Sequence, residues 1–218
     1  MTTRLKYNPP SLPLDILHHD SNILVVNKPS GLLTVPGKGE ELKDCLISRL
    51  KKVFPEVLLV HRLDLETSGV MMFALTAHAQ RHLGLQFEKR QVRKTYIANV
   101  WGDVTEKYGE IDAPLIVDWP NRPRQKICWS TGKSAFTEWR VLRRDKTFTR
   151  VRLTPTTGRS HQLRVHMLSI GHVIIGDKLY AKGAPLQASK RLNLHAESIK
   201  FRDPDGGKGL IFKSPCPF

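Results

Sequence analysis

Cysteine is scarce in this sequence: the chain has three, Cys45, Cys128 and Cys216, and none of them forms a CxxC motif. This spacing excludes the usual signatures of a zinc site and of a disulfide framework, and it favours reduced thiols in a cytoplasmic protein. The sequence also lacks a run of about 18 apolar residues, the length that a membrane span requires. Because the start, MTTRLKYNPPSLP, has no apolar segment, we predict no secretory signal.

Acidic residues are few relative to basic ones. The 218-residue chain has 35 Lys and Arg against 20 Asp and Glu, a formal net charge of +15, and its pI is about 10.0. Such an excess of positive charge favours nucleic acid or another anionic surface as a partner. A hydrophobic content of 40% is sufficient for a folded core. The length fits one large domain, or one domain with two lobes that share a cleft.

Strand patterns outnumber helical patterns, and many strands are neighbours in sequence. We therefore predict an α+β fold with a mixed, largely antiparallel central sheet and flanking helices. Residues 1–20 are expected to form an irregular arm and residues 21–218 a single domain. The expected strands are 23–26, 70–75, 95–102, 134–142, 148–158, 192–201 and 209–213, with a hairpin over 115–129 and helices over 42–53, 77–90 and 160–170.

The segment VHRLDLETSGVMMFALT places two carboxylates, Asp64 and Glu66, just before an apolar strand. An Asp at a turn most often accepts hydrogen bonds from nearby backbone amides, which is a structural role. The spacing of the pair does not by itself support a two-carboxylate glycosidase mechanism. The context favours function, because a basic HR dipeptide precedes Asp64 and a buried strand follows the TSG turn. A rigid mount of this kind suits a catalytic residue.

The segment TGRSHQLRVH, residues 157–166, joins a glycine-containing turn to a helix that Ser160 is expected to cap. Helix N-termini with nearby arginines bind phosphates and carboxylates, and Arg159 and Arg164 flank this one. Alternatively, the two arginines make surface contacts worth roughly 0–1 kcal/mol each. The residues alone leave these two interpretations balanced.

For three other residues, Arg122, Arg124 and Tyr96, the default interpretation is structural. Arg122 and Arg124 belong to a basic hairpin loop, which is either solvated or in electrostatic contact with nucleic acid. Tyr96 lies in a strand pattern in which a tyrosine usually packs against its neighbours.

Paired histidines do not indicate a metal site. His78 and His82 have the i, i+4 spacing of a metalloprotease helix, but Ala79 follows His78 where that motif has Glu. His161 and His166 lie five positions apart on one expected helix, a poor spacing for a shared metal. We therefore predict no metal.

Four segments together resemble the RluA-type pseudouridine synthases. HRLDLETSG is similar to the HRLD-x-x-TSG signature of that family, KTYIANVWG to its second motif and TGRSHQLRVH to its third, while VVNKPSGLLTVPG resembles its N-terminal segment. The segments follow the family's order and span residues 23 to 177, so the resemblance covers most of the chain. It implies the pseudouridine synthase fold, with a central RNA-binding cleft, and an isomerase activity.

The resemblance also implies a reaction: the N1–C1′ bond of a uridine is broken, the uracil rotates and is rejoined through C5, without cofactor, metal or energy source. Asp64 corresponds to the essential aspartate, whose role is nucleophile at C6, nucleophile at C1′ or base at the ribose 2′ position. Tyr96 corresponds to the tyrosine that stacks on the uracil and helps to remove the C5 proton, and Arg164 to the arginine that pairs with the aspartate. An adjacent guanidinium would keep Asp64 charged in a desolvated pocket.

Base flipping is a further implication, because a uridine cannot react inside a stacked stem-loop and its extrusion costs about a few kcal/mol. Arg62 corresponds to the residue that fills the space that the base leaves. Other basic residues are expected to hold the RNA backbone; the candidates are Lys28, Arg90, Arg93, Arg122, Arg124 and Arg159.

The short length, the lack of a separate S4-like domain and the DWPNRPRQK segment are most similar to dual-specificity members of the family. They imply 23S rRNA and a tRNA anticodon stem-loop as substrates, and a monomer. The alternatives are a synthase that acts on one of these RNAs, a non-catalytic basic RNA-binding protein, and a nuclease or glycosidase that leaves strand breaks or free uracil. The sequence specifies neither the target uridines nor which of its three roles Asp64 has.

Overall fold

A ten-stranded sheet forms the centre of the protein, and a two-stranded hairpin lies beside it. The computed structural model describes residues 7–218, so the first six residues of the predicted arm lie outside it. The strands are β1 (Asp15–His19), β2 (Ile23–Lys28), β3 (Leu58–Leu59), β4 (Ser68–Ala74), β5 (Arg93–Trp101), β6 (Tyr108–Asp112), β7 (Leu115–Val117), β8 (Gln125–Ile127), β9 (Phe136–Arg144), β10 (Phe148–Pro155), β11 (Leu194–Arg202) and β12 (Gly209–Lys213). The helices are η1 (Glu40–Leu42), α1 (Leu46–Lys51), α2 (Ala77–Glu88), η2 (Trp119–Asn121), α3 (Gln162–Ser169) and α4 (Ala184–Gln187).

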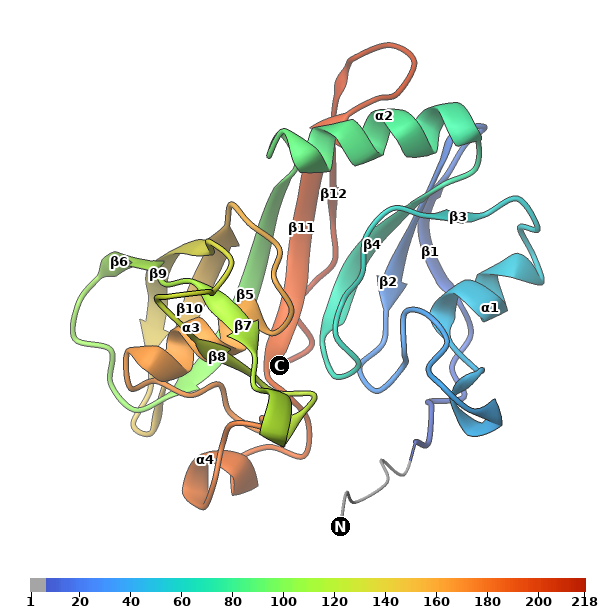
Figure 1. Ribbon diagram of the computed structural model, residues 1–218. Coiled ribbons are helices and arrows are strands. Elements are labelled where there is room, and N and C mark those ends of the chain that lie inside the picture. The colour runs from blue at the N-terminus through green and yellow to red at the C-terminus, as the bar shows by residue number, and fades with distance from the viewer. Residues whose placement is uncertain (1–6) are drawn as a thin grey trace.

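The strand order is β1-β2-β4-β11-β5-β10-β9-β6, with β3 on β4 and β12 on β11. Within residues 7–218 the one parallel pairing is that of β11 with β4. Strand β11 comes late in the chain but lies between β4 and β5, so it joins the N-terminal and C-terminal halves of the molecule (Figure 1). This arrangement confirms the predicted α+β fold with a mixed, largely antiparallel sheet. In the same part of the chain no helix is both long and apolar enough to cross a membrane.

Strands β2 and β4 are covered on both faces, which explains their continuous apolar sequences. Alternate residues of each strand enter different hydrophobic clusters, as the two-residue period of a strand requires. One cluster includes Leu46 and Leu50 of α1, and the other includes Ala79 and Leu83 of α2, which lies across the end of the sheet (Figure 1). Burial of each large apolar side chain contributes about 1.5–3 kcal/mol. The segment that leads into β4, residues 60–67, is thereby mounted on a rigid frame.

The C-terminal half has its own core beneath α3. Leu163 and Met167 of α3 pack with Val100 of β5 and Leu153 of β10. Tyr96 contacts this cluster and also the α1 cluster of the N-terminal half. The tyrosine therefore lies where the two halves of the molecule meet.

Two expectations about the N-terminal half were wrong. The irregular arm was predicted to extend to residue 20, but Asp15–His19 form β1, which pairs antiparallel with β2. Strand β1 lies at the edge of the sheet and is held by backbone pairing, so its side chains have little apolar alternation. The helix expected over 42–53 is shorter, because residues 40–42 form the separate 3₁₀ turn η1 and Cys45 is extended at the start of α1.

Ser160 does not cap α3, contrary to prediction. The N-cap residue is His161, whose backbone is left-handed with a φ of 54°. The side chain of Gln162 organises the turn instead, since its Oε1 accepts from the backbone amide of Arg159 at 3.0 Å and from the Thr157 hydroxyl at 2.7 Å. A left-handed conformation is uncommon for a residue with a side chain, and strain of this kind concentrates at functional sites.

Candidate active site

The loop that follows β2 in the chain holds the turn that carries Asp64. The Thr34 hydroxyl donates to the carbonyl of Leu63 at 2.8 Å, and the Ser30 hydroxyl donates to the carbonyl of Glu66 at 2.7 Å. The carbonyl of Leu65 accepts from the backbone amide of Gly31 at 2.9 Å. The backbone on both sides of Asp64 is therefore fixed by hydrogen bonds, and the turn is the rigid mount that the sequence predicted.

Lys28 belongs to this scaffold, and the prediction that it contacts RNA was wrong. Its side chain is 0% exposed, and Nζ donates to the carbonyls of Pro29, Leu32 and Leu65 at 2.9, 2.8 and 3.1 Å. Burial lowers the pKa of this lysine to about 7, although the charges of Asp64 and Glu66 oppose the shift. A cation whose three donors are all used by backbone carbonyls has none left for a phosphate.

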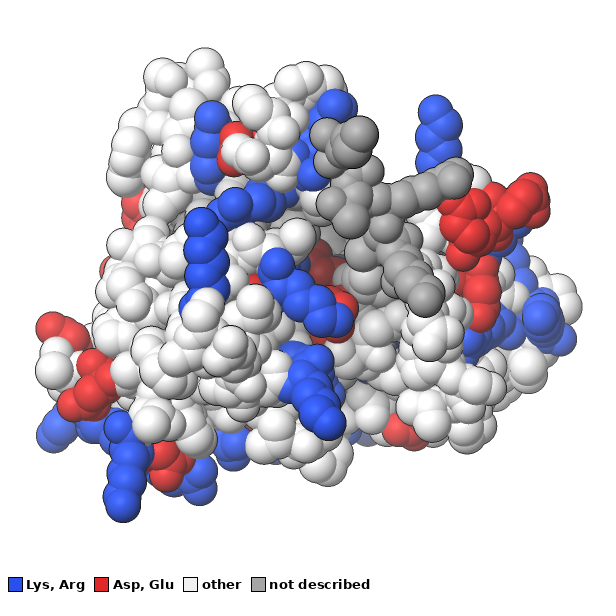
Figure 2. Space-filling model, turned by 90° about the horizontal axis from the view of Figure 1, so that it is seen from below, with Lys and Arg blue, Asp and Glu red and all other residues white. Residues whose placement is uncertain are grey.

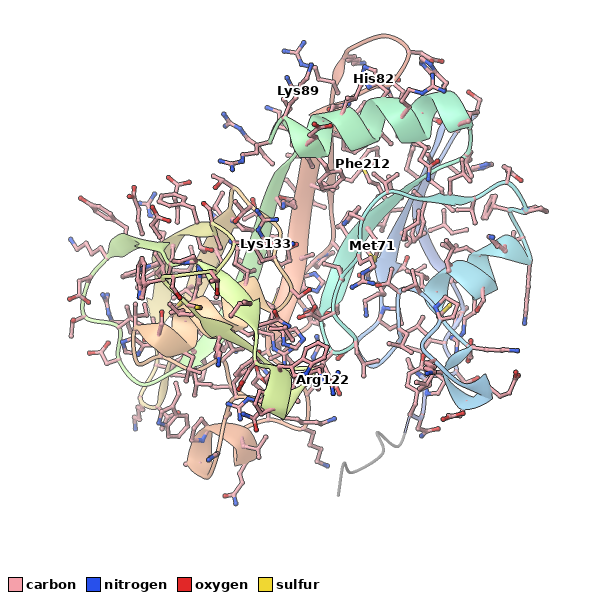
Figure 3. All side chains as sticks on the ribbon, in the orientation of Figure 1. Met71, His82, Lys89, Arg122, Lys133 and Phe212 are labelled. Carbon is pink, nitrogen blue, oxygen red and sulfur yellow. The ribbon has the colours of Figure 1, made fainter. Side chains whose placement is uncertain are left out.

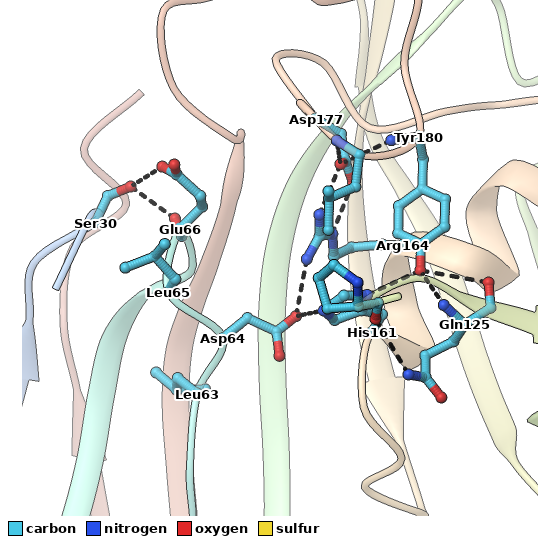
Figure 4. A network of polar contacts seen from close by, with 12 residues as sticks. Ser30, Leu63, Asp64, Leu65, Glu66, Gln125, His161, Arg164, Asp177 and Tyr180 are labelled. Atoms are coloured by element: carbon cyan, nitrogen blue, oxygen red, sulfur yellow. Dashed lines mark hydrogen bonds and ion pairs between the residues drawn. The ribbon is translucent and has the colours of Figure 1, made fainter. Parts of the chain in front are cut away.

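Arg164 contacts the Asp64 carboxylate, as predicted. Nη1 of Arg164 lies 3.2 Å from Oδ2 of Asp64 (Figure 4). The other donors of this guanidinium, Nε and Nη2, form a bidentate pair with Asp177 at 2.7 Å each. The side chains of Arg164 and Asp177 are 4% and 0% exposed, whereas that of Asp64 is 28% exposed. Arg164 is thus fixed from behind and presents one edge to a carboxylate that solvent reaches.

The charge of Arg164 is secured by this arrangement. Burial alone would lower its pKa, but the hydrogen bonds and charge of Asp177, together with Asp64, outweigh burial and raise the pKa above its ordinary value. Asp177 also accepts from the backbone amides of Leu179 and Tyr180 at 2.9 and 3.1 Å. Buried ion pairs are stable only when their remaining hydrogen-bonding capacity is satisfied, as it is here.

His161 and Tyr180 complete a polar network around Asp64 (Figure 4). Nε2 of His161 lies 3.9 Å from Oδ2 of Asp64, and its Nδ1 lies 2.8 Å from the hydroxyl of Tyr180. That hydroxyl accepts from the backbone amide of Gln125 at 2.7 Å. Burial lowers the pKa of His161, against the opposing charge of Asp64, and the imidazole is therefore neutral at neutral pH.

Tyr96 lies on β5, between Leu153 of β10 and Ala196 of β11. Burial raises the pKa of its phenol, and the negative charge of Asp64 raises it further. The phenol is therefore protonated at neutral pH and close enough to Asp64 to be influenced by its charge. The structure brings Asp64 and Arg164 into contact from two separate segments, and Tyr96 of a third segment is near enough for the charge of Asp64 to raise its pKa.

Glu66 does not join Asp64 in a carboxylate pair. Its Oε1 accepts from Lys178 Nζ at 2.9 Å, and the Ser30 hydroxyl approaches its Oε2 at 3.5 Å. These contacts engage Glu66 elsewhere and argue against the two-carboxylate mechanism considered for the sequence.

The basic candidates for RNA contact divide into two groups. Arg62 is exposed beside Asp64, Arg122 lies with its guanidinium 3.9 Å from the centre of the Trp119 ring, and Arg124 lies 5.2 Å from the Tyr180 ring. Arg159 is exposed in the turn before α3. Figure 3 labels Arg122 at the end of the molecule opposite to Lys89, which caps α2.

Arg90 and Arg93 are exposed and follow α2 on the side of Lys89, and Arg93 is the first residue of β5. Figure 2 views the molecule from below the orientation of Figure 1. Acidic atoms occupy a hollow in the middle of that face, and Lys and Arg side chains flank the hollow. A positive rim around a recessed carboxylate suits an anionic polymer that must deliver one group to an acid.

Sequence reasoning missed three residues of the site: Asp177, His161 and Tyr180. His161 was considered only as a metal ligand, and nothing local distinguishes Asp177 or Tyr180 from ordinary turn residues. The need for Asp177 becomes evident only from the structure, which buries Arg164 on α3, because a buried arginine needs an acidic partner.

Known proteins match this chain over most of its length. A sequence model of the RNA pseudouridylate synthase family matches residues 22–169. The dual-specificity RNA pseudouridine synthase RluA of Salmonella typhimurium strain LT2 is 51% identical over 97% of this chain and 98% of its own length. The protein of that name from Yersinia pestis is 52% identical over 93% of this chain and 99% of its own.

A solved structure agrees with the sequence comparisons. Human RNA pseudouridylate synthase domain containing 1 has a TM-score of 0.80 and 30% identity, covering 97% of this chain and 87% of the human chain. The motifs, the fold and the Asp64–Arg164 pair lead to the same conclusion as these relatives: the chain belongs to the RNA pseudouridylate synthase family, whose members are isomerases that act on RNA.

Proposed function

We propose that this chain converts specific uridines to pseudouridine in both 23S rRNA and a tRNA anticodon stem-loop, with Asp64 as the catalytic carboxylate. The observation that carries the assignment of Asp64 is its contact with Arg164 at 3.2 Å, made by an arginine that Asp177 fixes from behind. Dual specificity is supported by relatives that carry that description and are about half identical to this chain over nearly its whole length.

In the proposed reaction the N1–C1′ bond breaks and a C5–C1′ bond forms, while C5 loses a proton and N1 gains one. The product is an isomer of the substrate, so no net reactant is consumed. Asp64 must be ionised to act at C6, at C1′ or at the ribose. The Arg164 guanidinium stabilises that ionised form when a stacked base excludes water.

Tyr96 is proposed to stack on the uracil and to help to remove the C5 proton. Its phenol is protonated and influenced by the charge of Asp64, which suits a group that mediates proton transfer beside this carboxylate. Arg62, exposed two positions before Asp64, is proposed to fill the space that the flipped uridine leaves.

The RNA backbone is proposed to follow the basic rim near Asp64, with contacts to Arg122, Arg124 and Arg159. Arg122 stacks on Trp119, and an arginine stacked on an aromatic ring keeps its in-plane donors free for phosphate or base edges. Arg90 and Arg93 are proposed to contact only RNA that extends beyond a stem-loop to the α2 end of the molecule.

The reaction is proposed to need no metal and to be performed by a monomer. Arg164 already occupies Oδ2 of Asp64, and within residues 7–218 no group of three or more His, Cys, Asp or Glu side chains is placed to hold a metal ion. Activity in the presence of a chelator, and a monomer in sedimentation at the assay concentration, are the expected results.

Tritium release from RNA labelled at uridine C5 tests the function. We expect release from a 23S rRNA fragment and from a tRNA stem-loop, assayed separately. Release from only one RNA would show a single-substrate synthase, and release from neither would overturn the proposal.

The Asp64→Asn variant is the matched control in this assay. It should abolish release but leave RNA binding within a few-fold, because the amide keeps the shape of the side chain and loses its charge. Unchanged release by this variant would show that Asp64 is not the catalytic acid.

A further inference from the structure

Both contacts to the Asp64 carboxylate from this side of the site reach the same oxygen. Arg164 Nη1 lies 3.2 Å and His161 Nε2 lies 3.9 Å from Oδ2. The His161 side chain is 12% exposed and the Asp64 side chain 28% exposed, so the carboxylate is the more open of the two. Two fixed groups at one oxygen set the rotation of the carboxylate and direct Oδ1 away from them.

The hydrogen bonds of Tyr180 decide which nitrogen of His161 carries the proton. The Tyr180 hydroxyl oxygen already accepts from the Gln125 amide at 2.7 Å. Its own proton has two possible acceptors, Nδ1 of His161 at 2.8 Å and the carbonyl of Gln125 at 3.4 Å. The shorter contact places the proton on the histidine side, so Nδ1 accepts and Nε2 is the protonated nitrogen of a neutral imidazole.

Electrostatics favours the same tautomer. With the proton on Nδ1, the lone pair of Nε2 would face the Asp64 carboxylate and repel it. With the proton on Nε2, an N–H dipole points at Oδ2. Each group therefore donates to the next: the Gln125 amide to the Tyr180 hydroxyl, the Tyr180 hydroxyl to His161 Nδ1, and His161 Nε2 toward Asp64 Oδ2 (Figure 4).

The position of His161 is itself imposed by the fold. Its backbone has a φ of 54°, and the residue directly precedes α3, which carries Arg164. The ring of Tyr180 lies edge-on to His161 and also within 5.1 Å of the Arg164 guanidinium. Tyr180 thus contacts both groups that approach Oδ2: the imidazole of His161, whose backbone is left-handed, and the guanidinium of Arg164.

We propose that His161, held by the Tyr180 hydroxyl, is a positioning residue that donates Nε2–H to Oδ2 of Asp64 and so presents Oδ1 to the target nucleotide. The inference rests on the proposed role of Asp64 as the catalytic carboxylate. The separation of 3.9 Å is longer than a hydrogen bond, and closure onto bound RNA would shorten it, since catalytic contacts commonly tighten when substrate binds.

Two substitutions of His161 separate this role from a structural one. His161→Asn tolerates the left-handed backbone and keeps a polar group near Tyr180, but it is too short to reach Asp64. His161→Gln places an amide nitrogen near the position of Nε2. We expect single-turnover tritium release to fall roughly tenfold or more in His161→Asn, because small displacements of a reacting group are costly. His161→Gln should recover most of that loss, with RNA affinity unchanged in both variants.

Tyr180→Phe gives an independent test, because it removes the hydroxyl and leaves the ring that contacts Arg124 and Arg164. We expect a smaller loss of rate in this variant. The double variant His161→Asn, Tyr180→Phe should be no slower than His161→Asn alone, since Tyr180 acts through His161. Additive losses would overturn the proposal.

The remaining outcomes are also decisive. A His161→Asn variant that releases tritium at the unmodified rate, or that weakens RNA binding without slowing the bound step, would show that His161 does not position Asp64. Equal losses in the Asn and Gln variants would show the same. Failure of the proposed function itself is distinguishable, because the unmodified chain would then release no tritium from either RNA.

Discussion

The Asp64 carboxylate lies 3.2 Å from Nη1 of Arg164, a residue one hundred positions later in the chain. The arginine does not depend on Asp64 for its own stability, because Asp177 already holds Nε and Nη2. Asp64 can therefore be solvated, covered by a base or chemically engaged while its counter-charge stays in place. The pair is a preorganised electrostatic contact, the kind of arrangement that contributes most to many enzymatic rate enhancements.

Replacement of Asp177 should damage both folding and catalysis. In Asp177→Asn the buried Arg164 loses the charge that raises its pKa, and breaking a buried pair typically costs about 3–5 kcal/mol. We expect a lower midpoint of thermal unfolding and slower tritium release. Asp103→Asn is the matched control: it breaks an exposed pair with Arg144, where a change of about 0–1 kcal/mol is typical. Equal stability of the two variants would contradict the role given to Asp177.

Removal of the Tyr96 hydroxyl should slow turnover without weakening binding. Tyr96→Phe keeps the ring that packs between the two halves of the molecule but lacks a proton to transfer. A general acid–base group typically contributes about 10²–10⁴-fold to a rate, so a loss near the lower end of that range is expected in single-turnover assays. Tyr108→Phe, at a position 75% exposed, should have no effect. Full activity in Tyr96→Phe would remove the proton-transfer role.

His61 should make the protein acid-sensitive. Burial lowers its folded-state pKa from 6.5 to about 3, with a further contribution from the nearby charge of Lys94. As the pH falls below 6.5, the unfolded imidazole binds a proton that the folded one does not, so the stability is fully present above about 6.5 and is lost toward pH 3.

His61→Gln should flatten this dependence, because the glutamine does not titrate and its Oε1 can accept from the Met72 amide as His61 Nε2 does at 3.1 Å. Thermal unfolding midpoints between pH 7 and pH 4 provide the measurement. His78→Gln, at an exposed side chain, is the control and should keep the pH profile of the unmodified chain. A His61→Gln profile as steep as that of the control would show that His61 does not contribute.

The two basic groups should respond differently to the length of the RNA. Arg122→Ala should weaken binding to a stem-loop and reduce the slope of log affinity against log salt by about 1, as expected for a lost phosphate contact. Arg90→Ala should leave stem-loop binding unchanged and reduce the slope only with a longer rRNA fragment. The slopes of both variants are measured by binding titrations at several salt concentrations. A stem-loop slope that changes with Arg90 and not with Arg122 would place the RNA on the opposite end of the molecule.

Short-range sequence patterns were sufficient to predict the local features. The two-residue period of the strands, the apolar β2 and β4 segments and the rigid turn before β4 all follow from short-range pattern, and the structure confirms them. The excess positive charge and the Asp64 turn could likewise be identified without coordinates. Such features depend on residues within a few positions of one another, which is the range over which backbone geometry acts.

The pairing of polar groups, by contrast, depends on the three-dimensional fold. Lysine is usually a surface residue, but the fold buries Lys28 against three backbone carbonyls. Asp177 resembles an ordinary turn residue in the sequence, but the fold pairs it with Arg164. Even the oxygen of Asp64 that is held, Oδ2, depends on His161 and Arg164, which lie far later in the chain. A buried polar group must find its partner wherever the chain brings one, and a partner selected by three-dimensional proximity leaves no periodic signal in the sequence.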